Sequence, residues 1–205
     1  MSENPSELTT RPSLLVRLRD GDNDAWRTFV TTYSPLIFGY CRKHGLQEAD
    51  AADVAQEVLA GVARSLRSFR YQPERGRFRD WLGAVTRTKM NRYLHKELQG
   101  ARGAGGDEAD ASLDEVAALE ADSEWTAAFN ASVLQAALER IRPHFEPPSW
   151  RAFESVWVDN RPAAEVAREL GLGVASVYVA KSRVLKRLHD EILMLAEDIP
   201  HFIHG

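Results

Sequence analysis

Basic side chains are concentrated in two stretches of the sequence, and their positive charge points to phosphate binding. Between Arg64 and Glu97 ten Lys and Arg residues stand against three acids, which gives a local charge of +7. The shorter run from Lys181 to Arg187 holds four bases and no acid. Because phosphate affinity follows local charge, the overall charge of −4 does not exclude a nucleic acid as the partner.

Catalytic and metal-binding patterns are missing from the sequence. It contains no nucleophile elbow, no phosphate-cradling glycine loop and no His-centred triad. The single cysteine, Cys41, lies between Phe38 and His44 beside Tyr40, so we expect a small apolar filler on a helix. The histidines show no metal-ligand spacing. The sequence therefore predicts a protein that is not an enzyme and that holds no metal and no cofactor.

The second basic run closes a segment, Asn160 to Leu188, with the form of a helix-turn-helix. Pro162 suits the first turn of a helix, and Gly171 supplies the positive φ of a tight turn. We expect Ala180 to leave a nonpolar gap in the basic face. The predicted inner face consists of Val166, Ala167, Leu170, Leu172, Val174, Val177, Val184 and Leu188. A plain helical hairpin with a solvated basic face is the alternative.

The outer side of the second helix of this motif carries the candidate DNA contacts. Residues near the start of a recognition helix reach the edges of DNA base pairs, and basic side chains further along hold phosphates. Gly173 stands where a Ser or Thr N-cap is common, and it caps less well. The predicted outer side consists of Ala175, Ser176, Tyr178, Val179, Lys181, Ser182, Arg183 and Lys186. Of these we assign Ser176, Tyr178 and Lys181 to the major groove, and Arg183, Lys186 and also Arg187 to the DNA backbone.

Apolar residues recur at helical spacing along nearly the whole chain, and no segment alternates as a strand does. Helices are predicted over 13–19, from about Trp26 to Gly45, over 50–66 and over 78–96, with further helices from Trp125 onward. Pro35 should kink the second helix, and Gly45 should end it. The helix over 78–96 should bury Trp81, Leu82, Val85 and Leu94.

A glycine-rich, acidic stretch divides these helices into two groups. From Leu98 to Asn130 one base stands against eight acids, and four glycines lie between Gln99 and Asp110. Such a composition is typical of an interdomain linker. We therefore predict an all-α protein with a four-helix domain at 13–97, a flexible linker at 98–124, a helix-turn-helix domain at 125–192 and a tail at 193–205.

The segment from Asp50 to Leu59 resembles the polymerase-binding helix of the extracytoplasmic-function sigma factors, which are bacterial transcription initiation factors. In that family an Asp-x-x-Gln-Glu run faces the clamp helices of core RNA polymerase. The matching residues here are Asp53, Gln56 and Glu57. Their spacing puts them on one helix face, opposite a stripe of valines. An ordinary amphipathic helix would have the same solvent face.

Two further segments match the family in the expected order. The segment from Phe78 to Leu94 is similar to the helix that reads the promoter minus-ten element, and the helix-turn-helix corresponds to the minus-thirty-five reader. The first match implies DNA contacts from Arg87, Thr88, Lys89, Asn91 and Arg92. The family often has an acid where this chain has Arg92. The loop before this helix corresponds to the one that captures a flipped base, which implies contacts from Phe69, Tyr71, Arg75 and Arg77. A basic surface loop is the alternative.

The resemblance implies a protein with sigma domain 2 and sigma domain 4. Such a protein binds core RNA polymerase and directs it to promoter DNA. Family members are often held inactive, so an anti-sigma factor or another regulator is a further candidate partner. The N-terminus lacks a signal peptide, and no apolar run is long enough to cross a bilayer. We therefore expect a cytoplasmic protein with no membrane partner.

A stand-alone regulator is the competing interpretation. It would combine the helix-turn-helix with an N-terminal dimerisation or sensing domain, and it would bind a palindromic operator as a dimer without polymerase. Two features count against it. No coiled-coil heptad is visible, and the N-terminal half is itself basic where the sigma family reads DNA.

Overall fold

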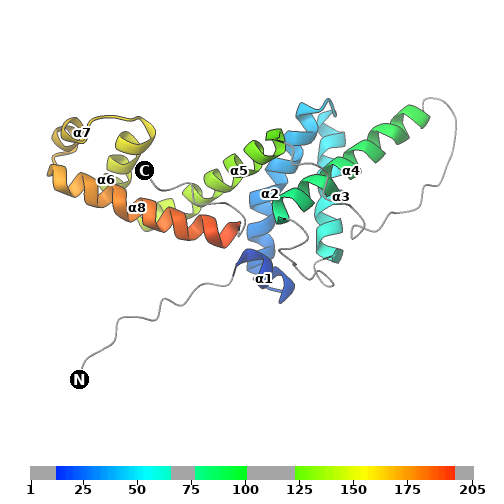
Figure 1. Ribbon diagram of the computed structural model, residues 1–205, viewed down its shortest axis with the longest axis horizontal. Helices are drawn as coiled ribbons and strands as arrows, with labels where there is room; N and C mark the ends of the chain where they lie inside the picture. Colours follow the sequence, from blue (N-terminus) through cyan, green and yellow to red (C-terminus); the bar gives the residue numbers. More distant parts are fainter. Residues whose placement is uncertain (1–12, 66–76, 101–122, 197–205) are drawn as a thin grey trace, which may run out of the picture.

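The protein is built from helices in two groups (Figure 1). The computed structural model describes residues 13–65, 77–100 and 123–196, and every regular element in these ranges is helical. The predicted all-α class is confirmed. The greater part of the predicted linker lies outside these ranges, as do Phe69, Tyr71 and Arg75. The predicted domain limits remain predictions.

The first group contains four helices. These are α1 (Leu14–Arg19), α2 (Asn23–Lys43), α3 (Glu48–Ser65) and α4 (Phe78–Gly100). Helix α2 packs against α1 and α3, and α3 packs against α4. Pro35 lies inside α2, and the helix continues through it to Lys43. Gly45 has a φ of +94°, so the residue that lacks a Cβ stands just after the end of α2, as predicted.

The second group begins with α5 (Ser123–Ile141), which runs into a 3-10 turn (Arg142–His144). Helix α6 (Pro147–Phe153) follows and passes directly into a π-helical turn (Glu154–Val158). The group ends with α7 (Ala163–Leu170) and the long α8 (Val174–Leu195). Helix α8 packs against α5, α6 and α7, so it is the central element of this group.

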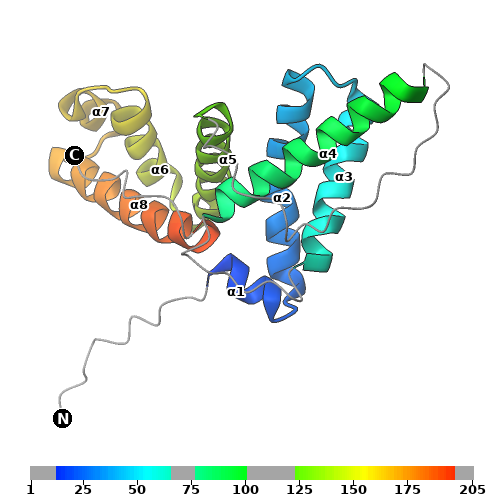
Figure 2. The ribbon, with the colours of Figure 1, turned by 45° about the vertical axis from the view of Figure 1, so that its right-hand side comes forward.

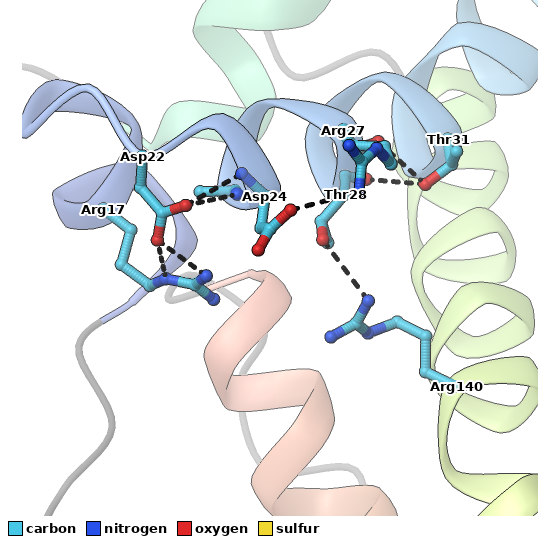
Figure 3. Close-up of polar contacts among 8 residues, drawn as sticks. Arg17, Asp22, Asp24, Arg27, Thr28, Thr31 and Arg140 are labelled. Atoms are coloured by element: carbon cyan, nitrogen blue, oxygen red, sulfur yellow. Dashed lines mark hydrogen bonds and ion pairs between the residues drawn. The ribbon is translucent and has the colours of Figure 1, made fainter.

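The start of α2 is fixed by a carboxylate cap. The Asp22 side chain accepts hydrogen bonds from the backbone N–H groups of Asp24 at 2.8 Å and Ala25 at 3.1 Å. It also pairs with the Arg17 guanidinium at 2.7 Å (Figure 3). The hydrogen bond from Ala25, followed by the one from Arg17, lowers the pKa of Asp22 below its ordinary value of 3.8. The cap satisfies N–H groups that have no partner within the helix.

Replacing Asp22 by Ala should lower the melting temperature at neutral pH, because two N–H groups of α2 lose their acceptor. The folded-state pKa lies below the unfolded one, so this stabilisation is present above pH 3.8 and is lost as the pH falls through the folded-state value. Calorimetry at pH 7 and at progressively lower pH should show the two proteins converging in acid. Asp20→Ala is the control, because that exposed carboxylate contacts the Arg19 side chain at 3.4 Å. A difference that persists unchanged in strong acid would contradict the prediction.

The core of the first group follows the predicted apolar stripes. Phe29, Tyr33 and Ile37 of α2 are fully buried, as are Leu82 and Val85 of α4. Two expectations for α4 differ from the structure. Leu94 is 36% exposed, and Trp81 is only half-buried. Leu94 lies beyond Met90, the last buried residue of α4 among those described, and the C-terminal end of α4 extends past the neighbouring helices (Figure 2).

Cys41 lies on the buried side of α2, as a small apolar filler would. Its side chain is fully buried. Burial disfavours the thiolate and raises the pKa of Cys41 to about 11.

Helix α5 joins the two groups through a shared core. It lies between α2 and α4 on one side and α6 and α8 on the other (Figure 2). Phe129 is fully buried and stacks on Tyr33 of α2, with ring centroids 5.3 Å apart. Trp125 packs edge-on against Tyr40 and donates a hydrogen bond from Nε1 to the Arg79 carbonyl at 2.8 Å. Buried residues of α1–α6 and of α8 from Val184 onward therefore form one continuous cluster.

Polar contacts reinforce this junction. The Arg140 guanidinium of α5 donates to Glu191 of α8 at 2.5 Å. It also donates to Thr28 of α2 at 3.3 Å (Figure 3). The Tyr33 hydroxyl donates to the Leu195 carbonyl at the end of α8 at 3.0 Å. Glu191 is only 5% exposed, and its pairing with Arg140 offsets part of the cost of burying its charge.

A glycine allows α4 and α5 to approach each other. A Cβ atom on Gly83 would lie 2.6 Å from Nε1 and 2.7 Å from Cδ1 of Trp125. Both distances are shorter than real Cβ contacts, so any other residue at this position would displace the tryptophan.

Candidate nucleic-acid interface

The polar face of α3 is exposed as the sequence predicts. Asp53, Gln56 and Glu57 are all exposed, and their spacing places them on one side of the helix. The opposite side buries Val54, Val58 and Val62 together with small alanines. The structure therefore brings the three residues together on a solvent-facing surface, which leaves them available to a partner.

Two polar contacts tie α3 to α4. The Tyr93 hydroxyl donates to the Asp50 carboxylate at 2.5 Å, and Lys89 Nζ lies 3.9 Å from Glu57 Oε2. The Lys89 side chain is only 11% exposed. It therefore turns toward α3, which corrects the prediction that Lys89 shares one DNA-facing surface with the other four candidates on α4. The ion pair places Lys89, a basic residue of the candidate DNA-binding helix α4, beside the polar face of α3.

The other four candidates on α4 share the outward half of that helix. Arg87 and Asn91 are four residues apart, as are Thr88 and Arg92, so each pair lies on one side. Asn91 is exposed, and the other three are half-buried. The exposed His95 lies one turn beyond Asn91 and was not among the sequence candidates, although the same spacing points to it.

Not all basic side chains at the start of α4 lie at the surface. Arg77, just before α4, is exposed, whereas Arg79 is 5% exposed and its Nε lies 3.3 Å from the Asp80 carboxylate. The backbone of Arg79 accepts the hydrogen bond of Trp125. Phe69, Tyr71 and Arg75 lie outside the described residues, so the base-capturing loop stays a prediction.

The helix-turn-helix has the predicted geometry. Helix α7 ends at Gly171, which has a φ of +65°, and the Leu172 N–H donates to the Ala167 carbonyl at 2.8 Å. Six residues form a small core of its own between α6, α7 and α8: Ala152, Ala163, Val166, Ala167, Val177 and Ala180. Two expectations are wrong. Val174 does not anchor the helix, because it is 43% exposed, and Ala180 lies in this core and not in the basic face.

The candidate contacts on α8 occupy different sides of the helix. Ser176, Tyr178, Arg183 and Lys186 are exposed. Lys181 and Arg187 are half-buried, and Arg187 Nη2 lies 4.0 Å from the buried Glu191 carboxylate. Since Val177, Ala180 and Val184 face inward, the opposite side has its centre at Ala175, Val179, Ser182 and Lys186. Ser176 and Lys181 flank this stripe on opposite sides.

A groove between α2 and α5 has a volume of about 630 Å³. Small and apolar residues such as Pro35, Gly39 and Ala128 line much of it, and the Lys43–Glu124 ion pair, at 2.8 Å, borders it. Within the described ranges no three His, Cys, Asp or Glu residues are grouped so that they could hold a metal ion. The helices of the same ranges include none long and apolar enough to span a membrane.

Comparison with known proteins adds one family match. Residues 29–98 match the model of the family described as Sigma-70 region 2. The match begins within α2 and ends within α4, so it includes the polar face of α3 and the candidate residues of α4, and α5–α8 lie outside it. No curated protein sequence matches the chain.

One solved structure that resembles the chain is described as CnrH in complex with the cytosolic domain of CnrY. It is 21% identical, and the alignment covers 86% of this chain and 92% of that one, with a TM-score of 0.35.

Proposed function

We propose that this protein is a sigma factor of the sigma-70 type, which binds core RNA polymerase and directs it to promoters. The observation that carries the proposal is the match of residues 29–98 to Sigma-70 region 2, because these residues include an exposed polar face on α3 and an outward basic face on α4. We further propose that it belongs to the extracytoplasmic-function group, because Asp53, Gln56 and Glu57 match the Asp-x-x-Gln-Glu run of that group.

Polymerase binding is assigned to the polar face of α3. Asp53, Gln56 and Glu57 are exposed, so they can dock on a basic partner helix without first leaving a buried site. Charged and polar groups at such an interface set its register and speed association. Glu57 also lies beside Lys89 of α4, so the bound polymerase would lie next to the DNA-reading helix.

Minus-ten recognition is assigned to α4 and the segment before it. Arg87, Thr88, Asn91 and Arg92 share the outward half of α4, where guanidinium and polar groups can reach phosphates and bases. The segment with Phe69, Tyr71, Arg75 and Arg77 would hold a base flipped from the melted strand. Unstacking a base costs a few kcal/mol, which aromatic and basic contacts would offset.

Minus-thirty-five recognition is assigned to the helix-turn-helix. Tyr178 lies near the start of α8, where side chains meet base edges, and Arg183 and Lys186 follow where phosphates lie. The protein would act as the specificity subunit, and polymerase would do the chemistry. An anti-sigma factor or another regulator that holds it inactive would be a further partner.

A double substitution on α3 tests the proposal. Gln56→Ala together with Glu57→Ala should weaken binding to purified sigma-free core polymerase roughly tenfold or more, because the docking face loses a hydrogen-bonding and a charged group. Fluorescence anisotropy of the labelled protein gives the Kd, and co-elution shows the complex. Gln135→Ala with Glu139→Ala is the matched control. It removes the same two residue types from an exposed site on α5, where they contact each other at 2.6 Å.

Binding or its absence in the wild type decides between the proposals. A complex that the α3 variant weakens and the α5 variant leaves intact supports the sigma-factor proposal. Failure of the folded wild type to bind active core polymerase would overturn it. A dimer that binds palindromic DNA without polymerase would then identify the protein as a stand-alone regulator.

A further inference from the structure

The first two turns of α8 expose apolar side chains at the surface. Val174, Tyr178 and Val179 are 43%, 57% and 50% exposed. Among the described residues six large hydrophobic side chains are exposed, and these three account for half of them. Such a concentration on one short stretch is unlike the scattered single apolar residues of an ordinary surface, and it marks a contact site.

The centre of this surface is defined by the helix register. Val177 and Ala180 are buried in the small core of the motif, and Val184 is buried in the larger core cluster. Ala175, Val179, Ser182 and Lys186 are spaced by four, three and four residues, so they form one stripe on the opposite side. The stripe is apolar in its first part and polar and then basic in its second part, where Arg183 also lies exposed.

This order of residues favours DNA over protein as the occupant. A protein partner for an apolar stripe would not require the Lys and Arg residues that continue it. DNA, by contrast, presents the edges of its base pairs in the major groove and phosphates on either side. The stretch from Lys181 to Arg187 has four basic residues and no acidic residue. The apolar part of the stripe would therefore lie over base edges while the basic part holds the backbone.

The major groove offers one apolar group, the C5-methyl of thymine. Over a G·C pair, an apolar side chain would instead cover hydrogen-bonding groups without pairing them, which is unfavourable. Ala175 is short enough to let the helix approach closely, and Val179 projects two methyl groups from the same stripe.

We propose that Ala175 and Val179 form a thymine-methyl contact site, so that the element read by α8 contains an A·T pair at a fixed position. This site rests on the proposed function, because it requires α8 to lie in the major groove of promoter DNA. Val179 is the specificity-determining residue of the site, and Ala175 permits the approach.

The test uses the holoenzyme formed by the full chain and core polymerase. Duplexes enriched from a random pool define the upstream element. Each thymine in that element is then replaced singly by deoxyuridine, which lacks only the 5-methyl group. One replacement should weaken wild-type binding about three- to fivefold, as expected for one buried methyl group. Val179→Ala should bind the thymine and deoxyuridine duplexes equally. The control Val158→Ala removes another exposed valine, 59% exposed and outside α8, and should keep the discrimination.

Three outcomes would overturn the inference, and they differ in what else they affect. Formation of a holoenzyme that enriches no upstream element would remove the minus-thirty-five role together with this site. An enriched element in which no deoxyuridine replacement weakens binding would overturn the methyl site alone, and the exposed valine would then be a protein contact. Discrimination that survives in Val179→Ala would overturn the assignment of the methyl contact to that residue.

Discussion

Phe129→Ala should lower the free energy of unfolding by about 3–5 kcal/mol, the cost of truncating a fully buried phenylalanine. Phe129 has no exposed surface, and its ring stacks on Tyr33, which is itself fully buried. The loss should be felt in both helical groups, because α5 joins them in one core. We expect the wild type to unfold in one transition, with a midpoint that the substitution lowers for both groups.

Urea titration followed by far-UV circular dichroism gives the free energy, and hydrogen exchange at α2 and α8 amides reports each group separately. Tyr178→Ala is the control, since this aromatic side chain is 57% exposed and lies outside the core. Its effect should stay within about 0.5 kcal/mol. Two separate transitions, or a loss in the α2 amides alone, would show that the groups do not share one cooperative core.

Adding a single methyl group to two helical glycines should change stability in opposite directions. Gly83→Ala introduces a Cβ that would lie 2.6 Å from the fully packed Trp125 ring. Overpacking of this kind costs about 1–3 kcal/mol, of which better helix propensity offsets about 1 kcal/mol. The Nε1 hydrogen bond from Trp125 to the Arg79 carbonyl should also be disturbed. We therefore expect a net loss of up to about 2 kcal/mol.

Gly39→Ala should instead raise stability by about 0.5–1 kcal/mol, because a helical glycine is replaced without a new contact. No heavy atom lies within 4 Å of a Cβ at Gly39 in α2. Paired urea titrations measure both changes, and Trp fluorescence should shift only in the Gly83 variant. Equal effects at the two positions would show that Trp125 does not press against Gly83 in solution.

Local spacing in the sequence was enough to predict the helices and the glycines that follow α2 and α7. Phe29, Tyr33 and Ile37 recur at helical spacing and are buried, and Gly45 and Gly171 have the positive φ that ends a helix. The register of α8 was also available from spacing. Val177, Ala180 and Val184 follow one inward stripe, so the burial of Ala180 could have been predicted had its position been weighed above its place in a basic run.

Contacts between helices were beyond local spacing. Charge alone groups Lys89 with its basic neighbours, but the pairing of α3 with α4 sets it beside Glu57. Leu94 and Val174 are apolar by pattern, yet no neighbouring element covers them fully. The packing of α5 and the end of α8 against α2 joins the two predicted domains. The apolar stripe of one helix does not indicate which other helix will cover it.

The buried thiol of Cys41 leaves the folded protein unreactive toward thiol-directed labelling reagents. It is the only cysteine in the chain, it is fully buried in α2, and its pKa of about 11 leaves little thiolate at neutral pH. Maleimides and oxidants react with thiolates, so they should spare the native state and modify the chain only after α2 opens. A cysteine introduced at the surface can therefore be labelled with a dye without competition from Cys41. The rate at which Cys41 itself is labelled measures how often the core opens.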